Sequence, residues 1–169
     1  MNEKKLIAVK TAHPLYGCID SSVTIKEYGV AASQYFYHAG EAFVYLASGL
    51  VTKALTATGT LMGYAIVPVG RGAGASDTYW LSSATAGADR LPVIVDPNAR
   101  YLLPGIITTT LAMLGGAWDL VAVNDGTATY VDLDTSSTDV VIALGLGTEY
   151  GGSATDVLVK INPIKFQAS

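Results

Sequence analysis

Between Asp119 and Pro163 the chain alternates short apolar, β-branched runs with clusters of Gly, Asn, Asp, Ser and Thr. The run 120–123 is followed by Asn124-Asp125-Gly126, a sequence that tolerates the positive φ of a tight hairpin. Strand-forming residues then resume over 127–133. This segment predicts antiparallel strands joined by turns, and it contains no recognisable catalytic set.

Two later runs of the same segment predict strands of different exposure. Residues 140–146 are continuously apolar and bounded by turn residues, which is typical of a strand buried on both faces. Residues 156–161 alternate between polar and apolar types, so we expect one face of that strand to be solvated. The polar stretches 134–137 and 151–153 are expected to be the loops before each strand.

Similar runs recur about every ten residues along the chain, a spacing that favours a sandwich or a barrel. One hairpin is expected from strands at 42–46 and 50–54, with Ala47-Ser48-Gly49 as the turn. The other expected strands are 22–26, 34–38, 61–69, 78–81, 91–95 and 100–103. Whether 108–115 forms a helix or a strand stays open, because periodicity cannot decide over so few residues.

We therefore predict an all-β fold, a compact antiparallel β-sandwich or β-barrel with long Gly/Ala/Ser-rich loops. A length of 169 residues favours one domain with a core that needs no disulfides. Residues 1–20 are interpreted as an extended N-terminal arm and 21–169 as a single β domain. No internal repeat of solenoid length is visible.

Charge and hydropathy exclude several classes of function. The net charge is −4 and no run of Lys or Arg exceeds two residues, which disfavours direct nucleic-acid binding. The apolar stretch 6–9 ends at Lys10, so no signal peptide is expected. The most apolar window, 101–118, is interrupted by Pro104, threonines and glycines, so no transmembrane helix is expected. With 50% hydrophobic and 14% charged residues, the composition instead hints at a subunit that buries surface in an assembly.

The single cysteine, Cys18, excludes an intrachain disulfide framework and is compatible with synthesis in the cytoplasm. It sits in Tyr-Gly-Cys-Ile-Asp beside apolar neighbours. A catalytic thiol needs an activating base nearby. We therefore interpret Cys18 as a buried small hydrophobic residue.

The stretch Gly70–Ala75 formally matches the dinucleotide fingerprint G-x-G-x-x-A, with Asp89 near the spacing expected for the acid. That interpretation requires a helix whose N-terminus meets the pyrophosphate. Residues 76–80 give no amphipathic helix, so we predict a surface loop and no cofactor.

Four carboxylates, at Asp125, Asp132, Asp134 and Asp139, lie close together in sequence. Calcium prefers such oxygen ligands, but the spacing is not that of a calcium-binding loop. A solvated loop is the favoured interpretation, and a calcium site is the alternative.

Other catalytic or metal-binding sets are not evident. The two histidines, His13 and His38, lack the motifs of a nucleophile elbow or a zinc protease, and we expect them at a surface or an interface. Glu27, Glu41 and Glu149 are scattered and suggest no glycosidase pair. We predict that the protein is not an enzyme and carries no catalytic residue, cofactor or metal.

Most of the large aromatic residues are expected in the core, and Tyr79-Trp80 is the better candidate for an interface. Aromatic side chains are favoured at the centres of interfaces, and Tyr79-Trp80 lies within a glycine-rich loop. The candidate interface residues are Leu6, Val9, Tyr16, Arg71, Tyr79 and Trp80.

Three segments resemble the head decoration, or capsid cement, proteins of tailed phages. The first is GEAFVYLASGLVTKALTATGTLMGYAIVPVGRGAG, at 40–74. The second is LPVIVDPNARYLL, at 91–103. The third begins with Asp119-Leu120-Val121 and continues with LDTSSTDVVIALGL and VLVKINP. Together they extend over roughly the last three-quarters of the chain.

The resemblance implies a non-enzymatic virion protein on the outer surface of a phage capsid. Such proteins clamp neighbouring major capsid proteins, often as trimers, so the implied partners are the major capsid protein and further copies of this chain. The alternatives are another virion component, such as a tail-tube or fibre protein, or a small β-barrel enzyme or ligand-binding module. The last would have a pocket lined by His38 or the acidic loop.

Overall fold

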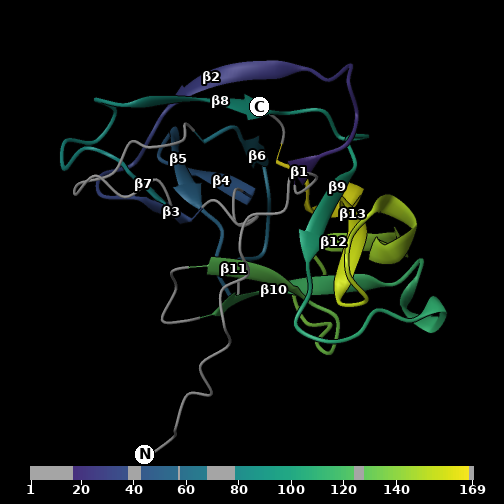
Figure 1. Cartoon of the computed structure of the whole chain (residues 1–169). Coiled ribbons are helices and arrows are strands. Elements are labelled where there is room, and N and C mark those ends of the chain that lie inside the picture. Colours follow the sequence, from purple (N-terminus) through teal and green to yellow (C-terminus); the bar gives the residue numbers. More distant parts are fainter. Residues whose placement is uncertain (1–16, 38–42, 57, 68–78, 124–127, 168–169) are drawn as a thin grey trace, which may run out of the picture.

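The computed structural model describes residues 17–37, 43–56, 58–67, 79–123 and 128–167. The fold is all-β, as predicted: antiparallel sheets pack together in the manner of a β-sandwich. The helices of the described residues are short 3₁₀ turns, η1 (Leu111–Met113), η3 (Gly147–Tyr150) and η4 (Pro163–Lys165). Figure 1 shows η1 and η3 as coiled ribbons at the right of the view.

The strands follow the β-branched and aromatic runs of the sequence. They are β1 (Gly17–Cys18), β2 (Ile25–Gly29), β3 (Tyr35–Tyr37), β4 (Phe43–Ala47), β5 (Leu50–Lys53), β6 (Gly63–Ala65), β7 (Tyr79–Leu81), β8 (Arg90–Ile94), β9 (Tyr101–Pro104), β10 (Ala117–Val123), β11 (Ala128–Asp132), β12 (Val141–Leu146) and β13 (Asp156–Ile161). The predicted hairpin of β4 and β5 forms around Ser48 and Gly49, whose φ values of 52° and 76° are those of a type I′ turn.

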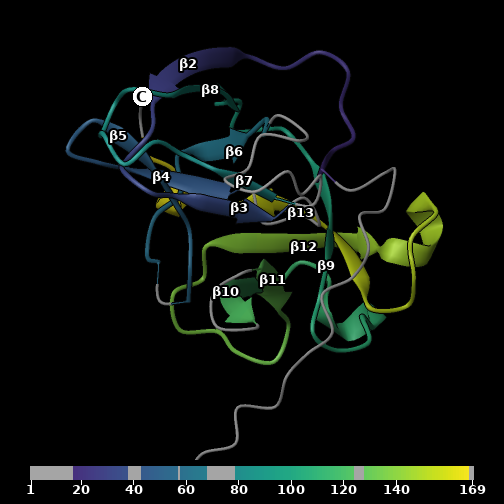
Figure 2. The ribbon, with the colours of Figure 1, turned by 60° about the vertical axis from the view of Figure 1, so that its left-hand side comes forward.

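The strands form three sheets. The six-stranded sheet has the order β1-β9-β13-β12-β10-β11, and the five-stranded sheet has the order β2-β8-β6-β4-β5. The third sheet is the pair β3-β7. In Figure 2 the five-stranded sheet and β3-β7 lie above the six-stranded sheet.

Both large sheets curl, so that strands far apart in the order meet. In the five-stranded sheet a parallel bridge joins Val30, just after β2, to Val51 of β5. In the six-stranded sheet a parallel bridge joins Gly105, just after β9, to Val131 of β11. Each curled sheet therefore encloses apolar side chains on its concave side.

Without its end strand β1, the six-stranded sheet has the same strand order as the five-stranded sheet. We define unit A as β2, β4, β5, β6 and β8, and unit B as β9, β10, β11, β12 and β13. When the strands of each unit are numbered in chain order, both units run 1-5-4-2-3, and the bridge then joins the third strand back to the first.

The register agrees as well as the order. If the closing bridges Val30–Val51 and Gly105–Val131 are superposed, the other paired residues correspond around the whole sheet. The corresponding pairs are Tyr45–Thr52 with Asp119–Asp132, Phe43–Tyr64 with Ala117–Ile142, Tyr64–Ile94 with Ile142–Lys160, and Gly29–Arg90 with Pro104–Asp156. This equivalence is one of strand pairing and is not visible as a repeat in the sequence.

Backbone hydrogen bonds beside the two bridges also correspond. The N–H of Ala31 donates to the carbonyl of Val51 at 2.9 Å, and that of Ile106 donates to the carbonyl of Val131 at 3.2 Å. Val30 likewise bonds to Asp89 at 2.9 Å where Gly105 bonds to Thr155 at 2.9 Å. Units A and B are therefore two versions of one backbone frame.

Aromatic side chains join the two units. Phe43 and Tyr64 of unit A pack against Tyr101 of unit B, with ring centroids 4.8 to 5.2 Å apart within the trio. The chain end adds a second link, because Gln167 bonds through its side chain to the N–H of Leu46 at 2.9 Å. One continuous hydrophobic core results.

Two predictions about exposure are wrong. The run 140–146 is not buried on both faces, because a β-bulge places Leu144 out of register and leaves it 37% exposed. The strand 156–161 has no solvated face, because it lies inside the sheet between β9 and β12 and all its residues except Lys160 are buried. Sheet position and a bulge, which periodicity does not report, decide both cases.

The boundary of the predicted arm also changes. Residues 1–16 lie outside the described residues, but Gly17 and Cys18 form β1 and pair with β9. Asp20 bonds to Arg100 at 2.7 Å. The end of the stretch 1–20 therefore belongs to the six-stranded sheet.

Candidate binding site

Of the predicted interface residues, Trp80 is placed wrongly by the sequence. Its side chain is 0% exposed and packs beside Phe36, with ring centroids 5.8 Å apart. Trp80 is buried because β7 pairs with β3, which brings both rings into the core. The other candidates, Leu6, Val9, Tyr16 and Arg71, and the side chain of Tyr79, lie outside the described residues.

Several other predicted features also lie outside the described residues, namely Gly70–Ala75, His13, His38, Glu41 and Asp125. Asp89 is described, and its carboxylate accepts a hydrogen bond from the N–H of Ser83 at 2.7 Å. Asp89 therefore holds a turn before β8.

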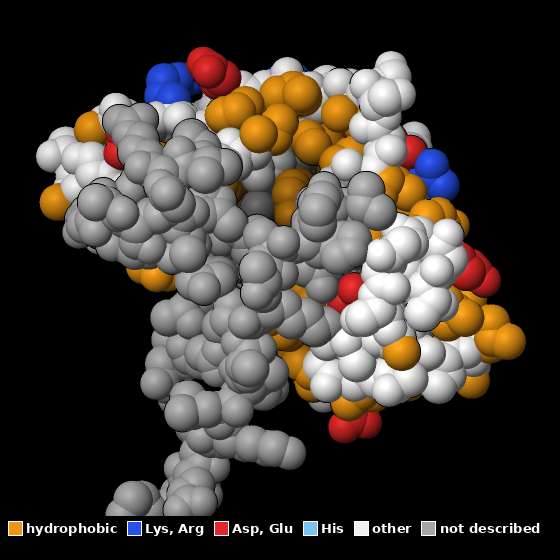
Figure 3. All heavy atoms as spheres, in the orientation of Figure 1, with side chains coloured by type: hydrophobic (Ala, Val, Ile, Leu, Met, Phe, Trp, Pro, Cys, Tyr) orange, Lys and Arg blue, Asp and Glu red, His pale blue; other side chains and the backbone are white. Residues whose placement is uncertain are grey.

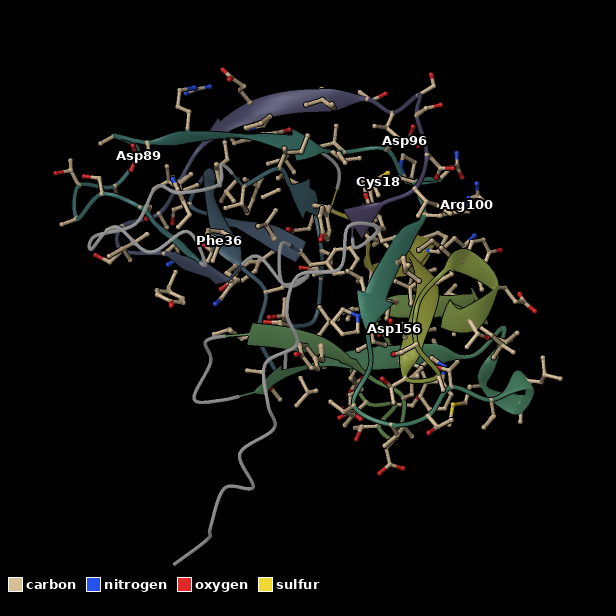
Figure 4. All side chains as sticks on the ribbon, in the orientation of Figure 1. Cys18, Phe36, Asp89, Asp96, Arg100 and Asp156 are labelled. Atoms are coloured by element: carbon tan, nitrogen blue, oxygen red, sulfur yellow. The ribbon has the colours of Figure 1, made fainter. Side chains whose placement is uncertain are left out.

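Cys18 packs against the core, but it is half-buried and not fully buried as expected. Burial raises the pKa of its thiol, and the neighbouring Asp20 and Asp96 carboxylates add to the rise. Figure 4 shows Cys18 near Asp96 and Arg100, beside β9. The surroundings of Cys18 thus favour the neutral thiol over the reactive thiolate.

The acidic loop of unit B is organised by Asp119, a residue that the sequence did not single out. The carboxylate of Asp119 accepts hydrogen bonds from the N–H groups of Ser137, Thr138 and Asp139 at 2.8 to 2.9 Å. It also accepts the hydroxyl of Ser137 at 2.6 Å. The loop 134–139 is therefore tied to β10.

These bonds determine the protonation state of Asp119. Burial to 5% exposure raises the pKa of the carboxyl, but the donors from Ser137, Asp139 and Thr138 outweigh it and hold the pKa at about 2. Within the described residues no group of three or more His, Cys, Asp or Glu side chains is arranged to hold a metal ion. The loop thus folds around a carboxylate of the protein itself.

Unit A has a groove at the corresponding end of its sheet. It has a volume of about 670 Å³, within the range of small-ligand pockets. Its lining includes Tyr35 of β3, Tyr45 of β4, and Thr52 and Lys53 of β5. Ser33 and Gln34, before β3, and the described residues among 55–60, after β5, complete the lining.

Hydrogen bonds fix both of these lining segments, the one before β3 and the loop after β5. Gln34 accepts the N–H of Lys53 at 3.0 Å, and its own backbone bonds to Ser82. In the loop after β5, Thr58 accepts the N–H of Leu55 at 2.9 Å, and Thr56 accepts the N–H of Ala122 at 2.7 Å. The groove is therefore built on a scaffold whose positions are set before a ligand arrives.

The groove contains one charged side chain among its described lining residues, Lys53, which is 5% exposed. Its ammonium lies 5.6 Å from the centre of the Tyr35 ring, a cation–π arrangement. The remaining described lining groups are hydroxyls, an amide, tyrosine rings and Leu55 and Gly59.

The outer faces of the two units differ too. In unit B, η3 contacts β9, β12 and β13, and the ring of Tyr150 lies so close to Gly145 that a Cβ there would be 2.8 Å from it. Leu102 and Leu158 on this face are buried. In unit A the corresponding face carries Ile25 and Ile66, which are 49% and 42% exposed.

We call this second surface the outer face of unit A. It comprises Ile25, Glu27, Pro92 and Ile66, which point to the same side of β2, β8 and β6. Figure 3 shows hydrophobic side chains gathered over this region at the top of the view. An ion pair of Arg90 with Glu27, 3.9 Å long, lies at its border.

The sequence carried a weak signal for the groove and none for Asp119. Tyr35 and Tyr45 stand in predicted strands, and the threonines follow the second, but their approach depends on the pairing of distant segments. Asp119 has its partners 18 to 20 residues later in the chain.

No helix in the described part of the chain combines the length and the hydropathy that a membrane crossing requires. Comparison with known proteins found no matching family, no matching curated protein and no matching solved structure.

Proposed function

We propose that this protein is a structural subunit of a phage virion. In this role it decorates the outer surface of the capsid and holds neighbouring major capsid proteins together, as a homotrimer. It is synthesised in the host cytoplasm. The observation that carries the proposal is the outer face of unit A, an exposed apolar surface on a hydrogen-bonded β frame.

The contrast with unit B supports an external partner for this face. The same face of unit B is covered by η3 of its own chain, whereas Ile25 and Ile66 of unit A are left exposed. Burying exposed aliphatic surface contributes about 25 cal/mol per Å². Each such contact is weak, but a symmetric trimer on a capsid repeats it many times and gains from multivalency.

The segments that resemble capsid cement proteins form the frame of both units. Their described residues include all or most of β4, β5, β6 and β8 in unit A, and all or part of β9, β10, β12 and β13 in unit B. The net charge of −4 suits a subunit on the outer surface, where no contact with packaged DNA is needed.

A tail-tube or fibre protein is the nearest rival, since it is also a β-rich virion component. Labelled antibody against this chain, imaged on intact particles, distinguishes the two. Labelling of the head surface is expected, and labelling confined to the tail contradicts the proposal.

Binding to capsids tests the proposal directly. The purified protein is mixed with expanded heads, free of decoration protein, assembled from the major capsid protein of the same genome. We expect it to sediment with the heads and to form a trimer in solution or on the head surface. The double variant Ile25→Ser/Ile66→Ser should bind at least tenfold more weakly, because it removes the apolar contact.

The matched control is Leu111→Ser, which changes an aliphatic residue of η1, between β9 and β10, that is 72% exposed. Its binding should equal that of the unchanged protein. A chain that stays monomeric and does not sediment with heads overturns the proposal. If the double variant binds as tightly as the unchanged protein, the outer face of unit A is not the capsid-binding surface.

A further inference from the structure

We propose that the groove of unit A binds a neutral oligosaccharide. The groove is the space lined by Ser33, Gln34, Tyr35, Tyr45 and Thr52 and closed by the loop that contains Thr58 and Gly59. This binding activity does not rest on the proposed capsid function, because its surface is separate from the outer face of unit A.

Unit B shows what happens when the same place is closed. Tyr45 and Thr52 form a cross-strand pair on the groove lining, and their counterparts are Asp119 and Asp132. In unit B the Asp119 carboxylate draws the following loop onto the sheet through four donors. Tyr45 has no carboxylate with which to do this, and Thr56 of the corresponding loop of unit A accepts the N–H of Ala122 of β10 instead.

The chemistry of the lining favours a polyhydroxylated ligand. Hydroxyl groups donate and accept hydrogen bonds, as sugar hydroxyls do, and an amide such as that of Gln34 offers both functions. Tyrosine combines a flat apolar ring, suited to the C–H face of a pyranose, with a polar hydroxyl. The groove brings Tyr35 and Tyr45 together with Thr52, Thr58 and Ser33.

The surface that the groove offers to a ligand is almost entirely uncharged, because Lys53 is only 5% exposed. No carboxylate is present among the described lining residues, and the one cation, Lys53, lies over the Tyr35 ring. That ammonium is thus oriented by a neighbour within the protein. Recognition in the groove therefore falls to uncharged hydroxyl, amide and ring groups.

The strand edge beside the groove argues against an extended peptide as the ligand. A peptide that adds to a sheet needs free N–H and C=O groups on an edge strand. On β5 the carbonyl of Val51 accepts the N–H of Ala31, and the N–H of Lys53 donates to Gln34. The edge is occupied there, which leaves side chains as the groups available for recognition.

Binding is tested with defined saccharides on the full chain. Maltohexaose, cellohexaose and chitohexaose are the neutral probes, and hexagalacturonate is the anionic comparator. Titrations followed by amide chemical shifts give both affinity and location. We expect at least one neutral hexasaccharide to bind, with the largest shifts at 33–35 and 52–60, and hexagalacturonate to bind at least tenfold more weakly.

Two variants locate the site. Tyr45→Ala removes one ring, and Gly59→Trp fills the space, since a Cβ at Gly59 meets nothing within 4 Å. Each should weaken binding at least tenfold. Ala112→Trp adds the same side chain to exposed η1, between β9 and β10, and should leave affinity unchanged. If Tyr45→Ala fails to fold, Gly59→Trp still tests the site, because its new side chain enters open space.

Three results overturn the proposal: no shift with any neutral probe, binding of hexagalacturonate as tight as that of the best neutral probe, or unchanged affinity in Gly59→Trp. None of them bears on sedimentation with phage heads, so failure here is distinguishable from failure of the capsid function.

Discussion

Units A and B share strand order and register, but corresponding surfaces are covered in unit B and open in unit A. In unit B, two surfaces are covered by segments of the same chain. Its loop 134–139 is tied to Asp119, and its outer face lies under η3. Unit A has a groove where unit B has the tied loop, and exposed isoleucines where unit B has η3.

The difference shows that strand pairing determines the backbone arrangement, while a few side chains determine which surfaces are open to a ligand or partner. Asp119 in unit B corresponds to Tyr45 in unit A, and this exchange accompanies the change from a tied loop to a groove. Gly145 admits the Tyr150 ring at a place where unit A has Ile66. Substitutions at corresponding positions should therefore have unequal effects.

The largest effect is expected at Gly63, whose counterpart in unit B is Val141. A Cβ at Gly63 would overlap the carbonyl oxygen of Ile94 and lie 2.9 Å from Val93. Gly63→Ala should therefore destabilise the fold by about 3 kcal/mol or more. Val141→Ala, which leaves a small cavity, should cost roughly 2 kcal/mol. Urea denaturation measures both, and a Gly63→Ala cost below that of Val141→Ala contradicts the close approach of β6 and β8.

Next in size is the loop anchor. Asp119→Asn replaces a charged acceptor of four hydrogen bonds and should cost about 2 to 3 kcal/mol. Tyr45→Phe at the corresponding position of unit A should change stability by less than about 0.5 kcal/mol. Chemical denaturation of the two variants gives the comparison. Similar costs at the two positions would show that the carboxylate does not hold the loop.

The same carboxylate makes stability depend on pH. The pKa of Asp119 is lowered from 3.8 to about 2 in the folded protein, so its ionised form stabilises the fold above the unfolded pKa. That contribution, about 2 kcal/mol, should be lost as the pH falls from about 4 to about 2. The measurement is the free energy of unfolding against pH for the unchanged protein and for Asp119→Asn. The difference between them should shrink over this interval, and a constant difference refutes the assignment.

The smallest effect is expected at the outer face. Gly145→Ala brings a Cβ to 2.8 Å from the Tyr150 ring, which must shift, at a cost of about 1 kcal/mol. The same change made in a Tyr150→Ala background should cost less, because the ring is gone. Ile66→Ala in unit A, at an exposed residue, serves as the control and should be near neutral. Additive costs of Gly145→Ala and Tyr150→Ala would show that the ring does not rest on Gly145.

The sequence predicted the fold class because β-branched runs and turn residues act locally. The β4–β5 hairpin was correct since Ser48-Gly49 determines the turn by itself. Exposure was predicted less well. The burial of 156–161 comes from its central place in the sheet, and Leu144 is exposed by a bulge.

The candidate sites depended even more on distant contacts. Trp80 stands in a glycine-rich segment, yet it is buried because β7 pairs with residues more than forty positions earlier. Asp119 looks like one polar residue in a strand, and its function becomes visible when the loop 134–139 folds back on it. The groove requires β3, β4, β5 and the loop after β5 to meet.

Hydrogen exchange of the two corresponding loops tests the contrast between the units most directly. The amides of Ser137, Thr138 and Asp139 donate to Asp119 and should exchange at least roughly tenfold more slowly than those of Gly59 and Thr60. Asp119→Asn should remove this difference. Equal protection of the two loops in the unchanged protein would contradict the account of one closed and one open unit.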